Sequence, residues 1–370
     1  MADRKPDASH AATWAATGGY QITVNYGTAQ VGTGRTTPPT AVPVPAAAAQ
    51  AAYDTGVELY KQGQLVDAEA AFRKAIELNP NNDRAVNYHG IALYDQRHFA
   101  KAEAAFRQAI VLDPNGIYTS NLGNALRGQG RFEEAEAAYR QAITLDPNYA
   151  YAFKALASTL FDQDRFEDAE AALRQVITLD PNYAYGFHGL GNALHSQGRF
   201  EEAEAAYRQA IALDPKLADA FNGLGNALHG HGRSEEAEAA YRRAIALNPN
   251  YVYAFHGLGN TLHGWGRFEE AEAAYRQAIA LDPNLAHAFN GLGNALHSQG
   301  RFEEAEAAYR RAIALNPNFA DAFNGLGNPL RSQGRLEEAE AAFRRAIELD
   351  SNFAYAFNGL GDVLRDQGRF

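Results

Sequence analysis

Residues 286–319 read AHAFNGLGNALHSQGRFEEAEAAYRRAIALNPNF, and this stretch decides the fold. In its first half, Phe289, Leu292 and Leu296 recur at intervals of three or four residues, a spacing that places them on one side of a helix. The second half repeats that spacing with Phe302, Ala305, Tyr309, Ala312 and Ile313. The stretch therefore predicts two helices, each with one apolar side.

Glycine and proline mark the ends of these two helices. Gly300 interrupts the pattern between them. Asn316 and Pro317 end the second helix, because proline lacks the amide hydrogen that a helix needs and restrains the residue before it. Glu306 and Arg310 lie four residues apart, a favourable pair on a surface that we expect to be simply solvated. Each such stretch is a predicted helical hairpin.

The hairpin recurs along the chain with a period of 34 residues, apart from one interval of 33. The prolines that mark the period are Pro80, Pro114, Pro147, Pro181, Pro215, Pro249, Pro283 and Pro317. We expect nine units over residues 49–353, and half of a tenth unit or a capping helix over residues 354–370. Pro329 replaces the residue equivalent to Ala295, and a proline inside a helix predicts a kink.

The pattern within a unit resembles the tetratricopeptide repeat family. The matching residues are Phe289, Leu292, Gly293, Leu296, Ala305, Tyr309 and Pro317, with Phe in place of the family's usual Trp and Leu in place of its first Tyr. The resemblance implies an all-α fold, a right-handed superhelix of helix pairs whose first helices line a concave groove. It also implies a role in binding or scaffolding other proteins.

The composition excludes several classes of function. Lys and Arg number 33 against 44 Asp and Glu, a net charge of -11, and the arginines are interleaved with glutamates. Since nucleic acids and anionic membranes bind clustered positive charge, we expect neither as a partner. No apolar run approaches the length of about 18 residues that membrane insertion requires. The absence of cysteine excludes disulfides, and we favour an extracellular or cell-surface location over the cytoplasm.

Polar residues opposite the apolar side of each first helix are the candidate groove lining. A side-chain amide offers a donor and an acceptor, so a column of asparagines can hold an extended peptide backbone regardless of its sequence. This column comprises Asn192, Asn226, Asn260, Asn294 and Asn328. The family resemblance assigns a peptide-holding role to Asn at this place. The other candidate peptide-binding residues are Tyr185, His188, Asn222, Tyr253, His256, Asn290 and Asn324.

Glycines lie beside the asparagine column, at Gly189, Gly223, Gly257, Gly291 and Gly325. Each costs a helix about 1 kcal/mol relative to Ala, so their repetition needs a cause. Two interpretations remain open. The groove floor is thinned for an extended guest, or the glycines serve helix-to-helix packing that duplication has multiplied.

The recurring histidines do not predict a metal site. His195, His229, His263 and His297 lie on successive units, which are too far apart for one ion, and no helix carries two histidines four residues apart. Polar groove lining is the favoured role, with a pH-responsive strip as the alternative. Neither a catalytic constellation nor a phosphate-binding glycine motif is present, so we expect no enzyme activity and no cofactor.

Residues 1–48 differ from the repeats, with Ala, Thr, Gly and Pro dominant, and predict an extended N-terminal arm. Alternating apolar residues predict a strand over residues 20–26 of this arm; they are Tyr20, Ile22, Val24 and Tyr26. Thr36, Thr37 and Thr40 lie beside prolines and are candidate acceptors for O-linked sugars.

The final helix poses the question of function. Phe357, Leu360, Val363 and Leu364 keep the internal apolar pattern, so either the array continues or another molecule covers this face. The leading hypothesis is a non-enzymatic structural protein that self-assembles head to tail into a filament, through end stacking and the N-terminal arm. The alternative is a monomeric adaptor whose groove binds extended peptides of another protein. A third hypothesis is the regulatory solenoid of a larger enzyme.

Overall fold

The computed structural model of the chain describes residues 44–369. The predicted strand at 20–26 and the candidate sugar acceptors Thr36, Thr37 and Thr40 lie outside the described residues. Every regular element between residues 44 and 369 is a helix, which confirms the predicted all-α fold for this range. None of the described helices is both long enough and apolar enough to cross a bilayer.

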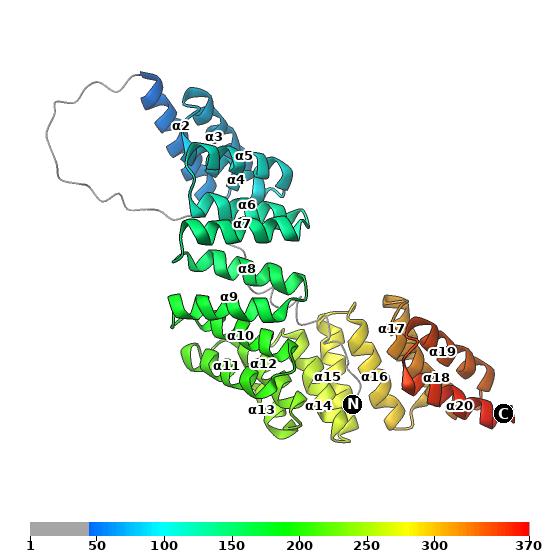
Figure 1. Cartoon of the computed structure of the whole chain (residues 1–370). Helices are drawn as coiled ribbons and strands as arrows, with labels where there is room; N and C mark the ends of the chain where they lie inside the picture. The colour runs from blue at the N-terminus through cyan, green and yellow to red at the C-terminus, as the bar shows by residue number, and fades with distance from the viewer. Residues whose placement is uncertain (1–43, 370) are drawn as a thin grey trace. The chain divides into compact units, whose positions relative to one another are not determined.

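The chain divides after Gly198 into two compact parts, each a succession of antiparallel helices (Figure 1). The helices of the first part are α2 (Val44–Lys61), α3 (Leu65–Leu78), α4 (Asp83–Asp95), α5 (Phe99–Leu112), α6 (Gly116–Gly128), α7 (Phe132–Leu145), α8 (Ala150–Asp162), α9 (Phe166–Leu179) and α10 (Ala184–Ser196). Those of the second part are α11 (Phe200–Leu213), α12 (Ala218–Gly230), α13 (Ser234–Leu247), α14 (Val252–Gly264), α15 (Phe268–Leu281), α16 (Ala286–Ser298), α17 (Phe302–Leu315), α18 (Ala320–Ser332), α19 (Leu336–Leu349) and α20 (Ala354–Asp366). Even-numbered helices are the first helices of their units, and odd-numbered helices are the second helices.

The pair α16–α17 is the hairpin predicted from residues 286–319. Gly300 lies in the turn with φ of 74°, a left-handed conformation that costs glycine little. At the end of α17, the backbone N–H of Asn316 donates to the carbonyl of Ala312, and Pro317 follows outside the helix. The predicted boundaries are therefore confirmed in this unit.

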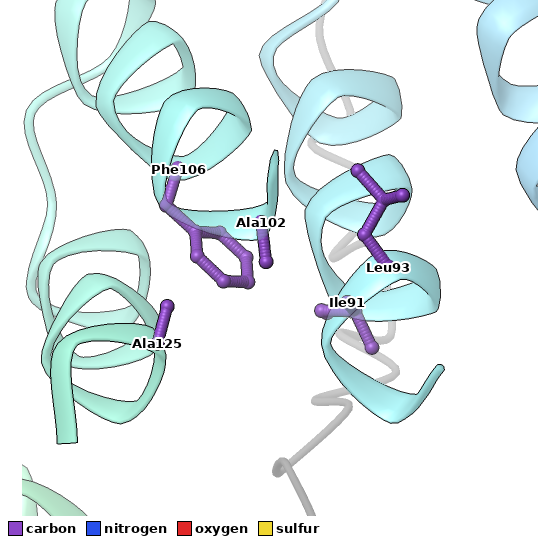
Figure 2. Close-up of a cluster of buried hydrophobic side chains, with 5 residues drawn as sticks. All are labelled: Ile91, Leu93, Ala102, Phe106 and Ala125. Atoms are coloured by element: carbon purple, nitrogen blue, oxygen red, sulfur yellow. The ribbon is translucent and has the colours of Figure 1, made fainter. Parts of the chain in front are cut away.

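In most second helices a large aromatic ring fills the space between neighbouring first helices; in α9 the residue at this position is Leu173. In the first part, Phe106 of α5 is completely buried, with Ile91 of α4 on one side and Ala125 of α6 on the other (Figure 2). Consecutive helices pack against one another, and α4 also contacts α6 directly. Ala102 of α5 is completely buried in the same cluster (Figure 2).

In the second part a tyrosine takes this place, and its ring is held between two glycines. A β-carbon built on Gly259 would lie 2.7 Å from Cε1 of Tyr275, and one built on Gly291 would lie 2.4 Å from the same atom. The ring thus occupies the space that a side chain at either position would need. The arrangement recurs at Tyr241 (Gly225 and Gly257), Tyr309 (Gly293 and Gly325) and Phe343 (Gly327 and Gly359).

The same distances decide between the two interpretations of the glycine column. A β-carbon on Gly223, Gly257, Gly291 or Gly325 would meet the tyrosine ring of the preceding second helix at 2.5 Å or less. At these positions the glycines serve helix packing, and the interpretation as a floor thinned for a guest is wrong.

The start of α2 corrects the predicted extent of the arm. The helix begins at Val44, inside the stretch 1–48 that was predicted to be extended. The alanines of Ala46–Ala49 favour helix strongly, and Pro45 is tolerated because a first-turn residue has no carbonyl acceptor within the helix. The single 33-residue interval is explained by a loop before α6 that is one residue shorter than usual. Helix α6 itself keeps the 13 residues that are usual for a first helix.

Helix α18 continues through Pro329 and has 13 residues, as α16 does. The proline therefore does not end the helix. Because Pro329 has no amide hydrogen, the carbonyl of Gly325 loses its usual helical donor, while the Pro329 carbonyl still accepts from Gln333.

Replacing a wedged glycine should destabilise the array. Gly291→Ala should lower the free energy of unfolding by about 1–3 kcal/mol, because the Tyr275 ring must shift to admit the methyl group. Gly361→Ala in α20 is the control: nothing lies within 4 Å of its built β-carbon. The control should gain about 0.5–1 kcal/mol of stability from the better helix propensity of Ala. Urea unfolding followed by circular dichroism measures both, and a shift of the same sign in both variants would contradict the packing argument.

Removing the proline of α18 should have the opposite effect. Pro329→Ala restores the missing backbone hydrogen bond and should stabilise the protein by up to about 3 kcal/mol. The matched reverse change, Ala295→Pro at the equivalent position of α16, should destabilise it by a similar amount. Thermal unfolding of both variants checks this pair, and a neutral Pro329→Ala would mean that the surroundings already compensate for the lost bond.

Candidate functional site

The candidate site is the first-helix face of the second part, formed by the polar positions of α12, α14, α16 and α18. These helices contact each other in sequence, α12 with α14, α14 with α16 and α16 with α18. Side chains link them: the ring centroids of His256 and His287 lie 6.5 Å apart, and His263 Nε2 lies 3.3 Å from Ser298 Oγ. The polar positions of successive units therefore form continuous columns.

The asparagine column is bound to the tyrosines of the core. Tyr275 donates its hydroxyl hydrogen to Oδ1 of Asn260 at 2.7 Å, and Tyr309 donates in the same way to Oδ1 of Asn294 at 2.7 Å. Tyr241 and Asn226 repeat the bond at 2.7 Å. Burial raises the pKa of Tyr241, Tyr275 and Tyr309 well above the usual range, so each hydroxyl remains a donor.

Two members of the predicted column differ from these three. Asn328 is exposed, and the ring of its hairpin is Phe343, which has no hydroxyl to donate. Its Nδ2 instead donates to the backbone carbonyl of Asn324 at 3.4 Å. Asn192, in the first part, is half-buried. The tyrosine hydroxyls were not recognised from the sequence, although Tyr recurs fifteen residues after Asn in unit after unit.

The second predicted column is less accessible than expected. His188 is only 4% exposed and Asn222 only 6%, so neither lines an open surface, and their prediction as groove contacts is wrong. Both side chains are covered by the packed helices around them. His256, Asn290 and Asn324 are half-buried, Tyr253 is half-buried, and Tyr185 is exposed.

The histidines at the ends of the first helices contact the second helix of their own hairpin or the next unit. His229 Nδ1 lies 3.2 Å from Thr261 Oγ1, and the rings of His263 and His297 each lie 5.4 Å from a phenylalanine at the start of the following helix. Burial lowers the pKa of all three imidazoles. Among residues 44–369 no group of three or more potential ligands could hold a metal ion.

Glutamates of the second helices, predicted to be solvated, join one unit to the next. The Glu272 carboxylate forms ion pairs with Arg276 of its own helix, at an N–O distance of 2.8 Å, and with Arg301 of the following unit, at 2.6 Å. Gln299 Nε2 donates to the same carboxylate at 3.0 Å. Burial alone would raise the pKa of Glu272, but these donors outweigh it and hold the pKa below its usual range.

This inter-unit ion pair recurs between Glu204 and Arg233, Glu238 and Arg267, Glu306 and Arg335, and Glu340 and Arg369. The predicted pair of Glu306 and Arg310 is present at 2.5 Å, but Glu306 is also buried beneath the next unit. The Glu and Arg pattern therefore belongs to the stacking of units as well as to the surface.

Helix α20 presents the face that was predicted to be covered. Phe357 is 49% exposed and Tyr355 is 66% exposed, while Leu360 and Leu364 are half-buried. Val363 is completely buried against its own chain, so its assignment to this face is wrong. Its register on the helix points it toward α18 and α19 rather than outward.

Family comparisons agree with the geometry of the hairpins. A model described as tetratricopeptide repeat matches four overlapping segments, residues 45–83, 53–117, 87–150 and 120–184. A second model of tetratricopeptide type, described as Cilia and flagella-associated protein 70 C-terminal domain, matches residues 186–369. The chain belongs to the tetratricopeptide repeat (TPR) family. As a TPR protein it is assigned to a class that mediates contacts between proteins and is typically non-enzymatic.

Two solved structures are similar to parts of this TPR chain. The crystal structure of MamA is 28% identical over 45% of this chain and 96% of its own, with a TM-score of 0.41. The structure of YrrB, described as a TPR protein with an unusual peptide-binding site, is 24% identical over 51% of this chain and 97% of its own, with a TM-score of 0.42. No curated protein matches the sequence.

The half-buried histidines predict a pH dependence of stability. Because burial lowers the pKa of His263 and His297 in the folded TPR array, the unfolded chain takes up protons first as the pH falls. Their contribution is fully present above the unfolded pKa of about 6.5 and is lost as the pH falls toward the lower folded value. The melting temperature should therefore drop between about pH 7 and pH 5, and the drop should be smaller in the double variant His263→Gln, His297→Gln. Identical profiles in both proteins would contradict this assignment.

Proposed function

We propose that the chain is a non-enzymatic TPR adaptor that binds an extended segment of another protein along the first-helix face of its second part. The observation that carries this proposal is the column formed by Asn226, Asn260 and Asn294, each fixed by a buried tyrosine hydroxyl at 2.7 Å. A fixed amide loses little side-chain entropy when it binds a ligand, which favours affinity. Repetition at the unit spacing suits a ligand that is itself extended and repetitive.

The charges near this column argue against recognition of a terminal carboxylate. The corresponding positions of α12, α14 and α16 hold Asn, His, Tyr and Asp but neither Lys nor Arg. Arg331 of α18 is already paired with Asp362 at 2.8 Å and with Asp366 at 2.6 Å. We therefore assign contact with the peptide backbone, rather than with its C-terminus, to this face.

The adaptor proposal can be tested with a displayed library of random twelve-residue peptides selected against the full chain. Enriched peptides should bind the double variant Asn260→Leu, Asn294→Leu at least about tenfold more weakly, because two backbone contacts are lost. Asn284→Leu in the exposed loop before α16 is the matched control and should bind unchanged. Enriched peptides that bind the double variant and the control equally would remove the first-helix face as the site.

Self-association into a filament is the second candidate, and the exposed aromatic side chains of α20 favour it. Tyr355 and Phe357, the two aromatic residues of that helix, are both exposed, and Gly361 has no ring beside it. In the helices α12, α14, α16 and α18 the equivalent glycine faces an aromatic ring of the following second helix. Helix α2 is itself the first helix of a unit, and its Gly56 already faces the ring of Phe72 in its own second helix, α3. Helix α2 therefore has no ring to offer to another first helix. Simple stacking of α20 on α2 would therefore leave Gly361 without a ring, and we place this candidate second.

Light scattering of the full chain over a range of concentrations separates the two candidates. The adaptor proposal expects a monomer whose mass is independent of concentration. A mass that rises with concentration, and that returns to the monomer value in Phe357→Ser, would favour self-association instead.

A further inference from the structure

The junction between α13 and α14 departs from the repeat in three places. Helix α13 begins with Ser234, where α11, α15 and α17 begin with phenylalanine. Helix α14 ends in Gly264, which has no side chain. Trp265 follows in place of the glutamine that is usual at this turn. Each departure removes or replaces a side chain at the edge of the array where the hairpins turn.

The phenylalanine at the start of a second helix can fill space against the end of the next first helix. A β-carbon built on Gly128 of α6 would lie 2.8 Å from Cδ1 of Phe99, and one built on Gly230 of α12 would lie 2.9 Å from Cε1 of Phe200. At the equivalent place in α14, apart from neighbours in the chain, nothing lies within 4 Å of a β-carbon built on Gly264. The serine of α13 therefore leaves open a space that a ring fills at the other two junctions.

The same phenylalanine also covers the end of its own first helix. The ring centroids of His263 and Phe268 lie 5.4 Å apart, and those of His297 and Phe302 repeat that distance. The α12–α13 hairpin has His229 and a serine at these two places. His229 is exposed, whereas the other two imidazoles are half-buried. The missing ring has thus left surface uncovered on both α12 and α14.

Trp265 lies at the edge of this uncovered surface. At another turn the equivalent residue reaches the start of the preceding second helix, because Gln299 Nε2 donates to the carbonyl of Phe268 at 3.3 Å. The register of the repeat therefore places Trp265 beside the start of α13. Its indole is 40% exposed and packs against Arg267, whose Cζ lies 6.0 Å from the ring centroid.

We call the open space beside Ser234, Gly264 and Trp265 the junction notch. An aromatic side chain suits it, because the molecule itself fills the equivalent places beside Gly128 and Gly230 with phenylalanine rings. A ring entering the notch would bury apolar surface against the Trp265 indole, and two rings pack favourably when offset or edge to face. Aromatic side chains seated in this way contribute much of the binding energy of protein interfaces.

The surroundings of the notch are acidic. Glu201, Glu235 and Glu269 occupy equivalent places in the first turns of α11, α13 and α15, and all three are exposed. The arginines of this edge, Arg233 and Arg267, are each paired with two glutamates of second helices. A partner with basic residues beside its aromatic side chain is therefore complementary to the notch and to a chain of net charge -11.

We propose that the junction notch binds an aromatic side chain of another protein, carried on a segment whose neighbouring residues are basic. The notch lies where the hairpins turn and includes none of the asparagines of the first-helix face. It is therefore a second binding site, beyond the proposed function, and either site can fail its test without the other.

Three identically labelled pentapeptides test the notch by fluorescence anisotropy with the full chain. They are Lys-Lys-Phe-Lys-Lys, Lys-Lys-Ala-Lys-Lys and Glu-Glu-Phe-Glu-Glu. The first should bind at least about tenfold more tightly than the second, because only the first buries a ring. It should bind at least about threefold more tightly than the third because of its charge. Equal affinity of the first two would overturn the aromatic assignment, and equal affinity of the first and third would overturn the basic partner.

The variant Ser234→Phe closes the notch from within, because it restores the residue that begins α11, α15 and α17. It should bind Lys-Lys-Phe-Lys-Lys at least about tenfold more weakly. Ala246→Phe adds the same ring at an exposed position in the last turn of the same helix, and this control should bind as the unaltered chain does. Unchanged binding to the Ser234→Phe variant, or an equal loss in both variants, would overturn the notch as the site.

The stability of Ser234→Phe tests the open space without any ligand. The new ring should raise the melting temperature by several degrees, because it buries apolar surface beside Gly264 as Phe200 does beside Gly230. An unchanged or lower melting temperature would mean that other side chains already occupy the space, and would overturn the inference.

A second copy of the chain is the competing occupant of the notch. With a partner in another protein, the mass measured by light scattering should not depend on concentration. A mass that rises with concentration in the unaltered chain, but not in Ser234→Phe, would assign the notch to self-association and overturn the proposed partner.

Discussion

The aromatic ring wedged between two glycines is the contact on which the rest of the second part depends. A hairpin cannot bury its own apolar side, so each unit is stable only against its neighbours. Tyr275 makes this contact by touching Gly259 of its own hairpin and Gly291 of the next. The same side chain orients Asn260 through its hydroxyl. Packing between units and the chemistry of the exposed face therefore meet in one residue, and a substitution there affects both.

The ion pairs between units have a different role from the rings. Arginines such as Arg301 are about one-third exposed, and exposed pairs contribute little to stability on their own. Their value lies in geometry, since one carboxylate such as Glu272 binds donors from its own helix and from the following turn. The buried rings supply most of the stabilising area, and the ion pairs favour one register of one unit on the next.

Periodicity predicted the helices well because the signals are local. The turn at Gly300 and the stop at Pro317 need only neighbouring residues, and they define the hairpin without knowledge of the stack. Contacts between side chains that lie 29 to 34 residues apart, in successive units, could not be predicted in the same way. Glu306 was expected to be solvated and Asn222 to be open, yet both are covered. The glycines left two interpretations because their neighbour, a tyrosine ring, belongs to the preceding unit.

The array is not uniform along its length. In most turns a glutamine donates to the glutamate of the preceding unit, as Gln299 does to Glu272 and Gln333 to Glu306. At two successive turns of the second part His231 and the exposed Trp265 replace that glutamine; His231 Nδ1 still lies 3.3 Å from Glu201 of the preceding second helix, whereas an indole ring cannot take over the role of the amide in the same way. In a linear lattice of nearest-neighbour couplings, cooperative units separate where coupling is weakest. Local opening should therefore begin at the junction marked by Trp265, and the indole of Trp265 lies where its emission would report it.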